Sequence, residues 1–295
     1  MTRNGILSSN SSAYLIVTAL LLAVCAVLLW RFPLRLGIEF VGGVVHEVRI
    51  ETKEERVSTT AITAAVSPIA EPVSIVGTGE SQFRLEFLTL SEEKQKEIEQ
   101  ALAPLGTVKT VQFSRKDPTV APTLQRQAVM TIAVVLVMVL VLIGVRFKSL
   151  PFAVTSLFAA FHDLVILLAV SSFLSHVTNF SADMLWVIAM VTGFCFSTHD
   201  TLVILNRLRE LQKVSPATPL SLLADQTLRS TIVRSLRMGL LTCAVLLALV
   251  AIGPASLQAF GIILFLGVVV GMYSSFFVVL PVLVLEKSFV RVRHS

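Results

Sequence analysis

Two pairs of ionisable residues lie inside long apolar runs of this sequence. Asp163 follows His162 in one run, and Asp200 follows His199 in another. A charge near the centre of a bilayer costs several kcal/mol and seldom persists there without a role. A carboxyl in such a place can take up a proton from one side of a membrane and release it to the other. The two pairs are therefore candidate members of a proton relay.

The neighbours of Asp200 support this chemistry, because hydroxyls can help to conduct a proton. They are Ser197, Thr198 and Thr201. Structural alternatives stay open for both acids. Asp163 could be a helix-packing group hydrogen-bonded to a neighbour, and Asp200 could be an interfacial carboxylate paired with Arg207, one to two helical turns further on.

The sequence argues against metal and enzyme chemistry. Neighbouring residues on a helix point about 100° apart, so a zinc site at the His-Asp pairs would require two helices to converge. A role as histidines that titrate near neutral pH suits His162 and His199 better than metal binding does. The sequence contains no Gly-rich phosphate loop, nucleophile elbow or supported Ser/His/Asp set. We expect no metal, no cofactor and no enzymatic turnover.

The composition places these residues in a membrane protein. Of the 295 residues, 55% are hydrophobic and 15% are charged, against about 25% charged in ordinary soluble domains. Residues 31–126 hold 12 of the 24 Lys/Arg and 13 of the 19 Asp/Glu. The rest of the chain contains apolar runs long enough to span a bilayer, which takes about 20 residues. Six spans are expected, at 13–30, 127–146, 151–174, 184–206, 232–253 and 257–285.

Further details of these runs bear on targeting and packing. The first run ends at Trp30-Arg31-Phe32-Pro33 without a small-residue cleavage site, so we expect an uncleaved anchor. The three cysteines all lie in apolar runs, which excludes a disulfide framework for the polar segment. Three glycines in the last run permit a bend or close helix packing, within the chain or with a partner. They are Gly261, Gly267 and Gly271.

The basic residues predict the orientation. Links on one side of the membrane carry Lys and Arg, whereas the opposite links, 175–183 and 253–256, carry none. The basic links contain Arg146, Lys148, Arg207, Arg209, Lys213, Arg229, Arg234 and Arg237, and the tail adds Lys287, Arg291 and Arg293. By the positive-inside rule this side is cytoplasmic. Arg31 and Arg35 argue weakly the other way. The same positive charges explain the net charge of +5 better than nucleic-acid binding does, and they predict contact with anionic lipids.

We therefore expect a multi-pass protein of the cytoplasmic (inner) membrane with both termini inside. Its parts would be a cytoplasmic N-terminus with the first span (1–30), an extracytoplasmic domain (31–126), a five-helix bundle (127–285) and a cytoplasmic tail (286–295).

The extracytoplasmic segment has the pattern of a small α+β domain. Strands are expected at 44–50, 72–77, 83–88 and 107–113, where apolar residues alternate or valines gather. Helices are expected at 58–66 and, with Ser91 as a cap, at 91–105. Residues 77–80 read as a hairpin turn. The order strand, helix, strand, strand, helix, strand is that of a ferredoxin-like (βαββαβ) domain. A domain this small has a marginal core that gains from a partner.

Six short motifs now combine in one order along the chain. They are Gly37-Ile38-Glu39-Phe40-Val41-Gly42-Gly43, Val120-Ala121-Pro122-Thr123, Phe161-His162-Asp163, His199-Asp200-Thr201-Leu202-Val203 with Asn206-Arg207-Leu208-Arg209-Glu210, Gln226-Thr227-Leu228, and Gly271-Met272-Tyr273-Ser274-Ser275-Phe276. Each is weak alone. Together, on a six-span topology and from about Leu36 to Leu285, they resemble the SecF family, which belongs with SecD to the resistance-nodulation-division superfamily.

The resemblance implies a function and partners. A SecF-like subunit would use the proton-motive force to assist late translocation of polypeptides, with no catalysis of its own. Its partners would be SecD, the SecY translocation channel complex, the unfolded translocating polypeptide and protons. Motif positions carried over to this chain are Gly37, Glu39, Phe40, Gly42, Gly43, Thr201, Arg207, Arg209, Glu210, Gly271, Ser274 and Ser275.

The resemblance also implies that Asp200 is the relay carboxyl and that an arginine after Gln-Thr-Leu is its partner. This chain departs from the family at both places. His199 stands where the family usually has Asn, and Arg229 follows Leu228 directly, where the family has one intervening residue. A shift of one residue turns a helical side chain by about 100°. Either His199 supplies the positive charge in a shifted relay, or the relay is lost.

Two other readings use the same residues. One is a proton-coupled, half-size efflux transporter of small molecules or lipids, and the other is a structural subunit whose proton path has decayed. Six spans and a small outer domain favour the export reading over efflux. Because six helices are half of the superfamily's bundle, a partner such as SecD or a second copy is expected in either case.

Overall fold

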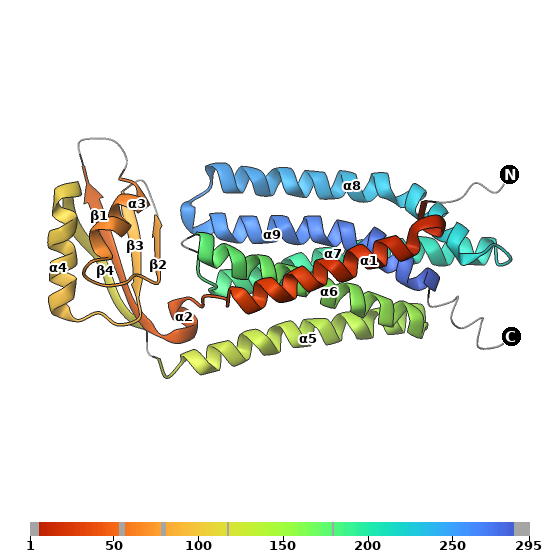
Figure 1. Ribbon diagram of the computed structural model, residues 1–295, viewed down its shortest axis with the longest axis horizontal. Coiled ribbons are helices and arrows are strands. Elements are labelled where there is room, and N and C mark those ends of the chain that lie inside the picture. Colours follow the sequence, from red (N-terminus) through yellow and green to blue (C-terminus); the bar gives the residue numbers. More distant parts are fainter. Residues whose placement is uncertain (1–5, 53–56, 78–80, 117, 179, 286–295) are drawn as a thin grey trace.

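The structure of this protein is a computed structural model that describes residues 6–52, 57–77, 81–116, 118–178 and 180–285. Within these ranges the chain forms a long helical bundle with a small α/β domain at one end (Figure 1). Two expected features lie wholly or mostly outside the described residues. They are the hairpin turn at 77–80, of which 78–80 are not described, and the tail at 286–295.

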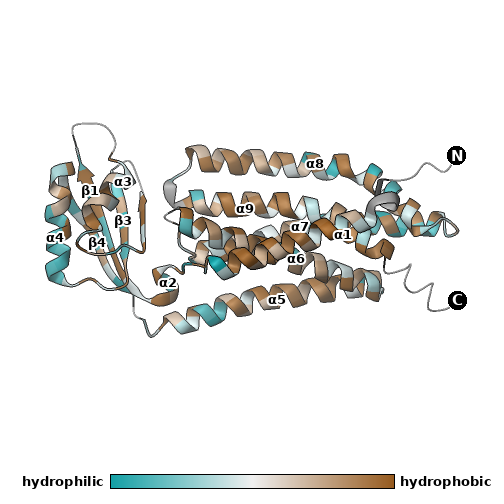
Figure 2. Ribbon diagram, viewed as in Figure 1, coloured by the Kyte–Doolittle hydropathy of each residue, from teal (hydrophilic) through white to brown (hydrophobic). Residues whose placement is uncertain are grey.

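Six helices in the described part of the chain are long and apolar enough to cross a membrane, which confirms the six expected spans. They are α1 (Ile6–Arg31), α5 (Ala121–Phe147), α6 (Leu150–Val177), α7 (Met184–Val214), α8 (Leu220–Ile252) and α9 (Ala255–Ser274), the last continuing through a π-helical stretch, η2 (Ser275–Val279), to residue 285. Apolar residues dominate all six, as the brown colouring of Figure 2 shows.

Several helices extend further than the apolar runs. The helix α8 begins at Leu220, 12 residues before the expected span at 232, because the amphipathic stretch with Arg229 and Arg234 continues into the span without a break. Likewise, α7 runs on to Val214, so its polar end projects beyond the apolar part. The start of α1 and the end of the last helix lie at the same end of the bundle, away from the sheet (Figure 1).

The small domain at the end of the bundle contains one four-stranded antiparallel sheet with the strand order β2-β3-β1-β4. Its strands are β1 (Gly43–Glu51), β2 (Ser74–Gly77), β3 (Gln82–Phe87) and β4 (Thr107–Lys116). The helix α3 (Thr59–Val66) follows β1, and α4 (Glu92–Leu102) with a 3₁₀ turn (Ala103–Leu105) precedes β4. This order of elements confirms the ferredoxin-like fold.

Local sequence explains the two helices of this domain. The Ser58 hydroxyl accepts a hydrogen bond from the Ala61 amide at the start of α3, and Ser91 does the same for Lys94 at the start of α4. Such caps satisfy backbone donors that have no partner inside the helix. Apolar side chains from both helices and from one face of the sheet then form a single core, with Ile62, Ile98 and Phe87 fully buried.

Candidate functional site: carboxyls in the helical bundle

Asp163 lies where three membrane helices meet. It is buried on α6, and its Oδ2 accepts hydrogen bonds from Ser197 on α7 at 2.5 Å and from Ser274 on α9 at 2.7 Å. Its Oδ1 lies 2.9 Å from His162 Nδ1. A buried carboxyl needs such partners, because an unsatisfied polar group in an apolar medium costs several kcal/mol. Asp163 therefore ties α6, α7 and α9 together.

His162 is also fully buried and points to its neighbour. The sequence argument expected adjacent helical residues to point apart, but the His162 and Asp163 side chains turn toward each other and are hydrogen-bonded. The second ring nitrogen of His162, Nε2, has no partner. The ring lies 6.1 Å from that of Tyr273, measured between centroids, and the Tyr273 hydroxyl is likewise buried without a partner.

Asp200 occupies a second buried position, closer to the polar end of α7. Its Oδ1 accepts a hydrogen bond from Ser235 of α8 at 2.5 Å, and its Oδ2 has no hydrogen-bond partner among the described residues. His199 beside it is exposed. Ser235 was not foreseen as its partner. It closes a series of buried polar residues four apart on α8, with Thr227 and Thr231, and that spacing was the available signal.

Neither arginine considered from the sequence pairs with Asp200 in the described part of the chain. Arg207 donates instead to Ser230 at 3.3 Å and to Glu210 at 3.1 Å, so the alternative of an Asp200–Arg207 pair is wrong. Arg229 is exposed, as its one-residue displacement predicts. Arg209 donates to the Arg146 carbonyl at 3.1 Å, and its guanidinium lies over the ring of Phe147.

Hydroxyls extend the polar surroundings of Asp163 along α7. Thr201, one turn after Ser197 on α7, lies 2.9 Å from the Ser275 hydroxyl, and Ser275 in turn donates to the Ser197 carbonyl at 3.4 Å. Because Ser197 also donates to Asp163, a continuous polar seam runs between α7 and the last helix. Thr198 is buried too, but its hydroxyl donates to the Phe194 carbonyl on its own helix.

Glycines allow α7 and the last helix to approach each other closely along this seam. A Cβ at Gly271 would lie 2.7 Å from Ser197 Cβ, and the Cα of Gly193 lies 3.0 Å from the Cβ position of Gly267. The third glycine, Gly261, faces Val250 of α8. Of the two possibilities left open by the sequence, packing within the chain is the one observed for all three.

The motif at 37–43 joins the sheet domain to α7. The Glu39 carboxylate accepts a hydrogen bond from the Met184 amide at the start of α7, at 3.0 Å. The Gly37 amide donates to the Ala182 carbonyl at 2.7 Å, just before this helix. Within the motif, residues 38–41 form the short helix α2 (Ile38–Val41). The sheet domain is thus attached directly to the helix that carries Ser197 and Asp200.

The rest of the motif fixes the position of the start of β1. The Phe40 carbonyl accepts a hydrogen bond from the Gln125 side chain of α5 at 2.5 Å. Gly42 has a φ of 80°, and a Cβ there would lie 2.6 Å from Pro118 Cα. Gly43 packs against the Phe87 carbonyl of β3. Glycine is required at these two positions because the backbone conformation and the close approach both exclude a side chain.

Three carboxyl groups lie close together where the sheet domain meets the start of α7. Asp183 caps α7 by accepting from the Trp186 amide at 2.8 Å, and Glu39 accepts from the Met184 amide of the same helix. Glu86 of β3 and Asp183 line a cavity of about 390 Å³. Burial, and then the nearby carboxylates of Asp183 and Glu39, raise the pKa of Glu86 to about 7, against the opposing effects of Arg84 and Lys116. Burial also raises the pKa of Asp183.

We expect a pH-dependent stability from this cluster. An acid whose pKa is higher in the folded state stabilises that state below its unfolded pKa, and the contribution is lost as the pH rises through the folded value. For Glu86 the window runs from 4.5 to about 7, and the effect is about 1–3 kcal/mol. Thermal unfolding of the protein in detergent, from about pH 5 to 8, will show a falling melting temperature that Glu86→Gln flattens.

The matched control is Glu97→Gln, which neutralises an exposed carboxyl on α4. It should leave the slope of melting temperature against pH unchanged. An unaltered slope in Glu86→Gln would show that Glu86 does not titrate in this range.

Comparison with known proteins first defines the class. Residues 96–288 match the family model described as "Protein export membrane protein SecD/SecF, C-terminal". With six membrane-spanning helices, the chain is a multi-pass membrane protein of the protein-export class, and it belongs to the SecD/SecF family. Within that family its relatives are SecF subunits, which confirms the resemblance noted in the sequence.

The relatives cover most of the chain. It is 30% identical over 259 residues to the protein translocase subunit SecF of Rhodothermus marinus, covering 85% of this chain and 83% of that protein. The SecF of a Synechocystis strain is 29% identical, covering 84% and 81%. A crystal structure of SecDF from Thermus thermophilus aligns with a TM-score of 0.79 at 26% identity, covering 95% of this chain and 38% of the SecDF chain.

A second SecDF structure, in a form called super-membrane-facing, aligns with a TM-score of 0.75 at 25% identity. It covers 97% of this chain and 39% of that chain. In these fused relatives the part similar to this protein is joined to a longer segment.

Proposed function

We propose that this protein is a SecF-type subunit of the Sec export machinery, which uses the proton-motive force to assist late translocation of polypeptides. The observation that carries the proposal is the pair of buried carboxyls in the helical bundle, each of which accepts hydrogen bonds from serine hydroxyls of neighbouring helices. Asp163 accepts from Ser197 and Ser274, and Asp200 accepts from Ser235. The protein's surroundings would be the cytoplasmic membrane, with both termini cytoplasmic and the sheet domain outside.

Asp200 is proposed as the proton-exchanging group. One of its oxygens is held by Ser235, and the other is free of protein partners, so it can accept a proton without breaking an existing bond. His199 is exposed beside it and is proposed to supply the positive charge that Arg229, turned away, does not. Asp163 with His162 would form the second station, reached through Ser197 and its neighbours.

Coupling to the outer domain is proposed to pass through α7. The helix carries Ser197 and Asp200, and its first amide is held by Glu39 of the motif that leads into β1. A change of protonation that shifts α7 would therefore act on the joint of the outer domain. In this scheme proton passage changes the position of a domain that holds the emerging polypeptide.

The proposed partners follow from this role. They are SecD, the SecY channel complex, the unfolded polypeptide, protons, and anionic lipids at the basic cytoplasmic end. The Arg146 and Arg209 guanidiniums at that end both lie near the ring of Phe147. Cations at this level suit contact with anionic headgroups.

The test is Asp200→Asn, which keeps the shape and removes the titratable group. Proton-gradient-dependent export is measured in vesicles, together with the amount of protein bound to SecD. We expect the complex to assemble and the contribution of the gradient to disappear. Unchanged export by an intact complex would reject Asp200 as a relay.

A further inference from the structure

The two edge strands of the sheet differ in length and in how much of each is covered by the rest of the protein. The edge strand β2 has only four residues and packs against the start of α9 at the bundle. The opposite edge strand, β4, has ten residues, eight of them exposed, and within the described chain it pairs only with β1. Exposed sheet edges are normally short or covered, because their free amides and carbonyls invite another strand. The edge at β4 is therefore an available pairing surface.

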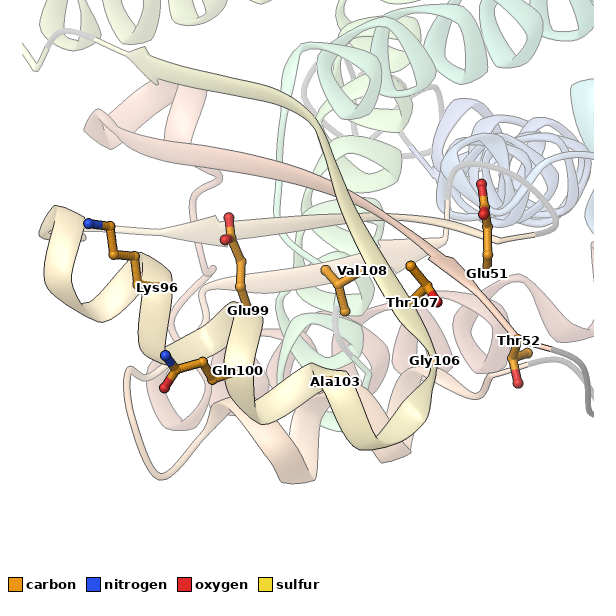
Figure 3. A pocket seen from close by; sticks show the side chains of 9 residues that line it. All are labelled: Glu51, Thr52, Lys96, Glu99, Gln100, Ala103, Gly106, Thr107 and Val108. Carbon is orange, nitrogen blue, oxygen red and sulfur yellow. The ribbon is translucent and has the colours of Figure 1, made fainter.

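A groove accompanies this edge between β4 and α4. Figure 3 shows the residues that line its wider hollow, of about 820 Å³, among them Lys96, Glu99 and Gln100 of α4 and Thr107 and Val108 of β4. A second hollow of about 460 Å³ lies toward the other end of β4, beside Leu88 and Arg115. Between them, the Thr110 hydroxyl donates to Glu99 at 2.7 Å. The groove thus offers space for side chains next to the free edge.

The charged side chains that line the groove determine which peptide segments it favours. Its two hollows are lined by four basic side chains and two acidic ones, which are Lys94, Lys96, Arg115 and Lys116 against Glu51 and Glu99. The strand itself carries Lys109 as well and no carboxylate. A neutral or acidic segment suits this surface, whereas a basic segment would be repelled.

We propose that β4 accepts an extended segment of polypeptide as a fifth strand of the sheet, with a preference for neutral or acidic segments. The inference rests on the proposed function and names the surface on which the outer domain holds its substrate. Strand addition obtains its affinity from main-chain hydrogen bonds. Such bonds do not depend on sequence, which is what a binder of many different unfolded chains requires.

The irregularity in β4 limits how long such a pairing can be. The register against β1 shifts between Glu47 and Val48, so that Val111 is an extra residue on β4. A bulge of this kind interrupts the ladder and increases the local twist. Two short stretches, 107–110 and 112–116, remain for pairing. Short pairing is weak, and a chain that must move on requires weak binding.

The experiment uses the full chain with SecD in membrane vesicles and an arrested export substrate. A photoreactive amino acid replaces Val111, which is 49% exposed on β4, and in a control it replaces Glu97, which is exposed on α4. Substrates carry either an acidic or a basic extended segment at the outer exit. We expect cross-linking to the acidic segment from position 111 to exceed that from position 97 by about threefold or more.

A second variant tests the pairing itself. Val111→Lys adds a charge to the edge, the usual protection against strand addition, and should reduce cross-linking of a neutral extended segment from position 112, whereas Glu97→Lys should not. Cross-linking should persist in the Asp200→Asn background, so that failure of the relay and failure of this binding surface are separable. Equal yields from positions 111 and 97, or adducts of position 111 with SecD or a second copy instead of the substrate, would overturn the proposal.

Discussion

Asp163→Ala is expected to destabilise the helical bundle severely. The carboxylate accepts hydrogen bonds from Ser197 and Ser274 and contacts His162. Alanine leaves Ser197 and His162 without this partner, at about 1–3 kcal/mol for each unsatisfied group, whereas Ser274 keeps the Gly271 carbonyl as an acceptor at 3.2 Å. The sum is a large part of the stability of an ordinary domain, which is about 5–15 kcal/mol. Thermal unfolding and size-exclusion profiles of the purified protein in detergent measure the effect.

Asp163→Asn is the control that separates packing from proton transfer. The asparagine keeps one acceptor oxygen for the serine hydroxyls but does not titrate, so most of the stability should return. If this variant folds and its export still responds to the proton gradient, Asp163 is the packing group that the sequence left open as an alternative. If it folds and the response is lost, Asp163 belongs to the relay. An alanine variant as stable as the native protein would contradict the structural role.

The elements of this fold could be predicted because their signals are local. Runs of about 20 apolar residues indicate spans, and alternation with period two indicates strands. The expected strand 44–50 is observed at Gly43–Glu51, and the expected helix 58–66 at Thr59–Val66. Helix ends were less accurate. A polar amphipathic stretch can continue a spanning helix, as at the start of α8, and hydropathy alone does not register it.

The partners of the acids could not be predicted in the same way. Residue type and depth identified Asp163 and Asp200, because charges in apolar runs are conspicuous. Which hydroxyl reaches which carboxyl depends on how helices pack, and that is set by contacts between segments far apart in the chain. Ser274 lies 111 residues from Asp163. Ser235 reaches Asp200, whereas Arg207, which is nearer in the sequence, turns to Ser230 and Glu210.

Gly271→Ala is expected to separate α7 from the last helix and thereby to weaken the seam that holds Asp163. The new Cβ would lie 2.7 Å from Ser197 Cβ and 2.8 Å from Ser197 Cα, and backbone atoms on a packed helix cannot move aside like the end of a flexible side chain. Overpacking of this kind costs about 1–3 kcal/mol. It also pushes Ser197 away from Asp163. We expect a lower melting temperature together with weaker proton-gradient-dependent export.

Gly144→Ala provides the matched control, because it makes the same chemical change in a membrane helix where nothing lies within 4 Å of the new Cβ. Alanine favours a helix over glycine by about 1 kcal/mol, so this variant should be as stable as the native protein or slightly more so. A loss of stability at position 144 equal to that at position 271 would mean that glycine is needed for backbone reasons unrelated to the seam. A loss confined to position 271, with export reduced in parallel, would show that close packing of α7 against the last helix maintains the polar contacts of Asp163.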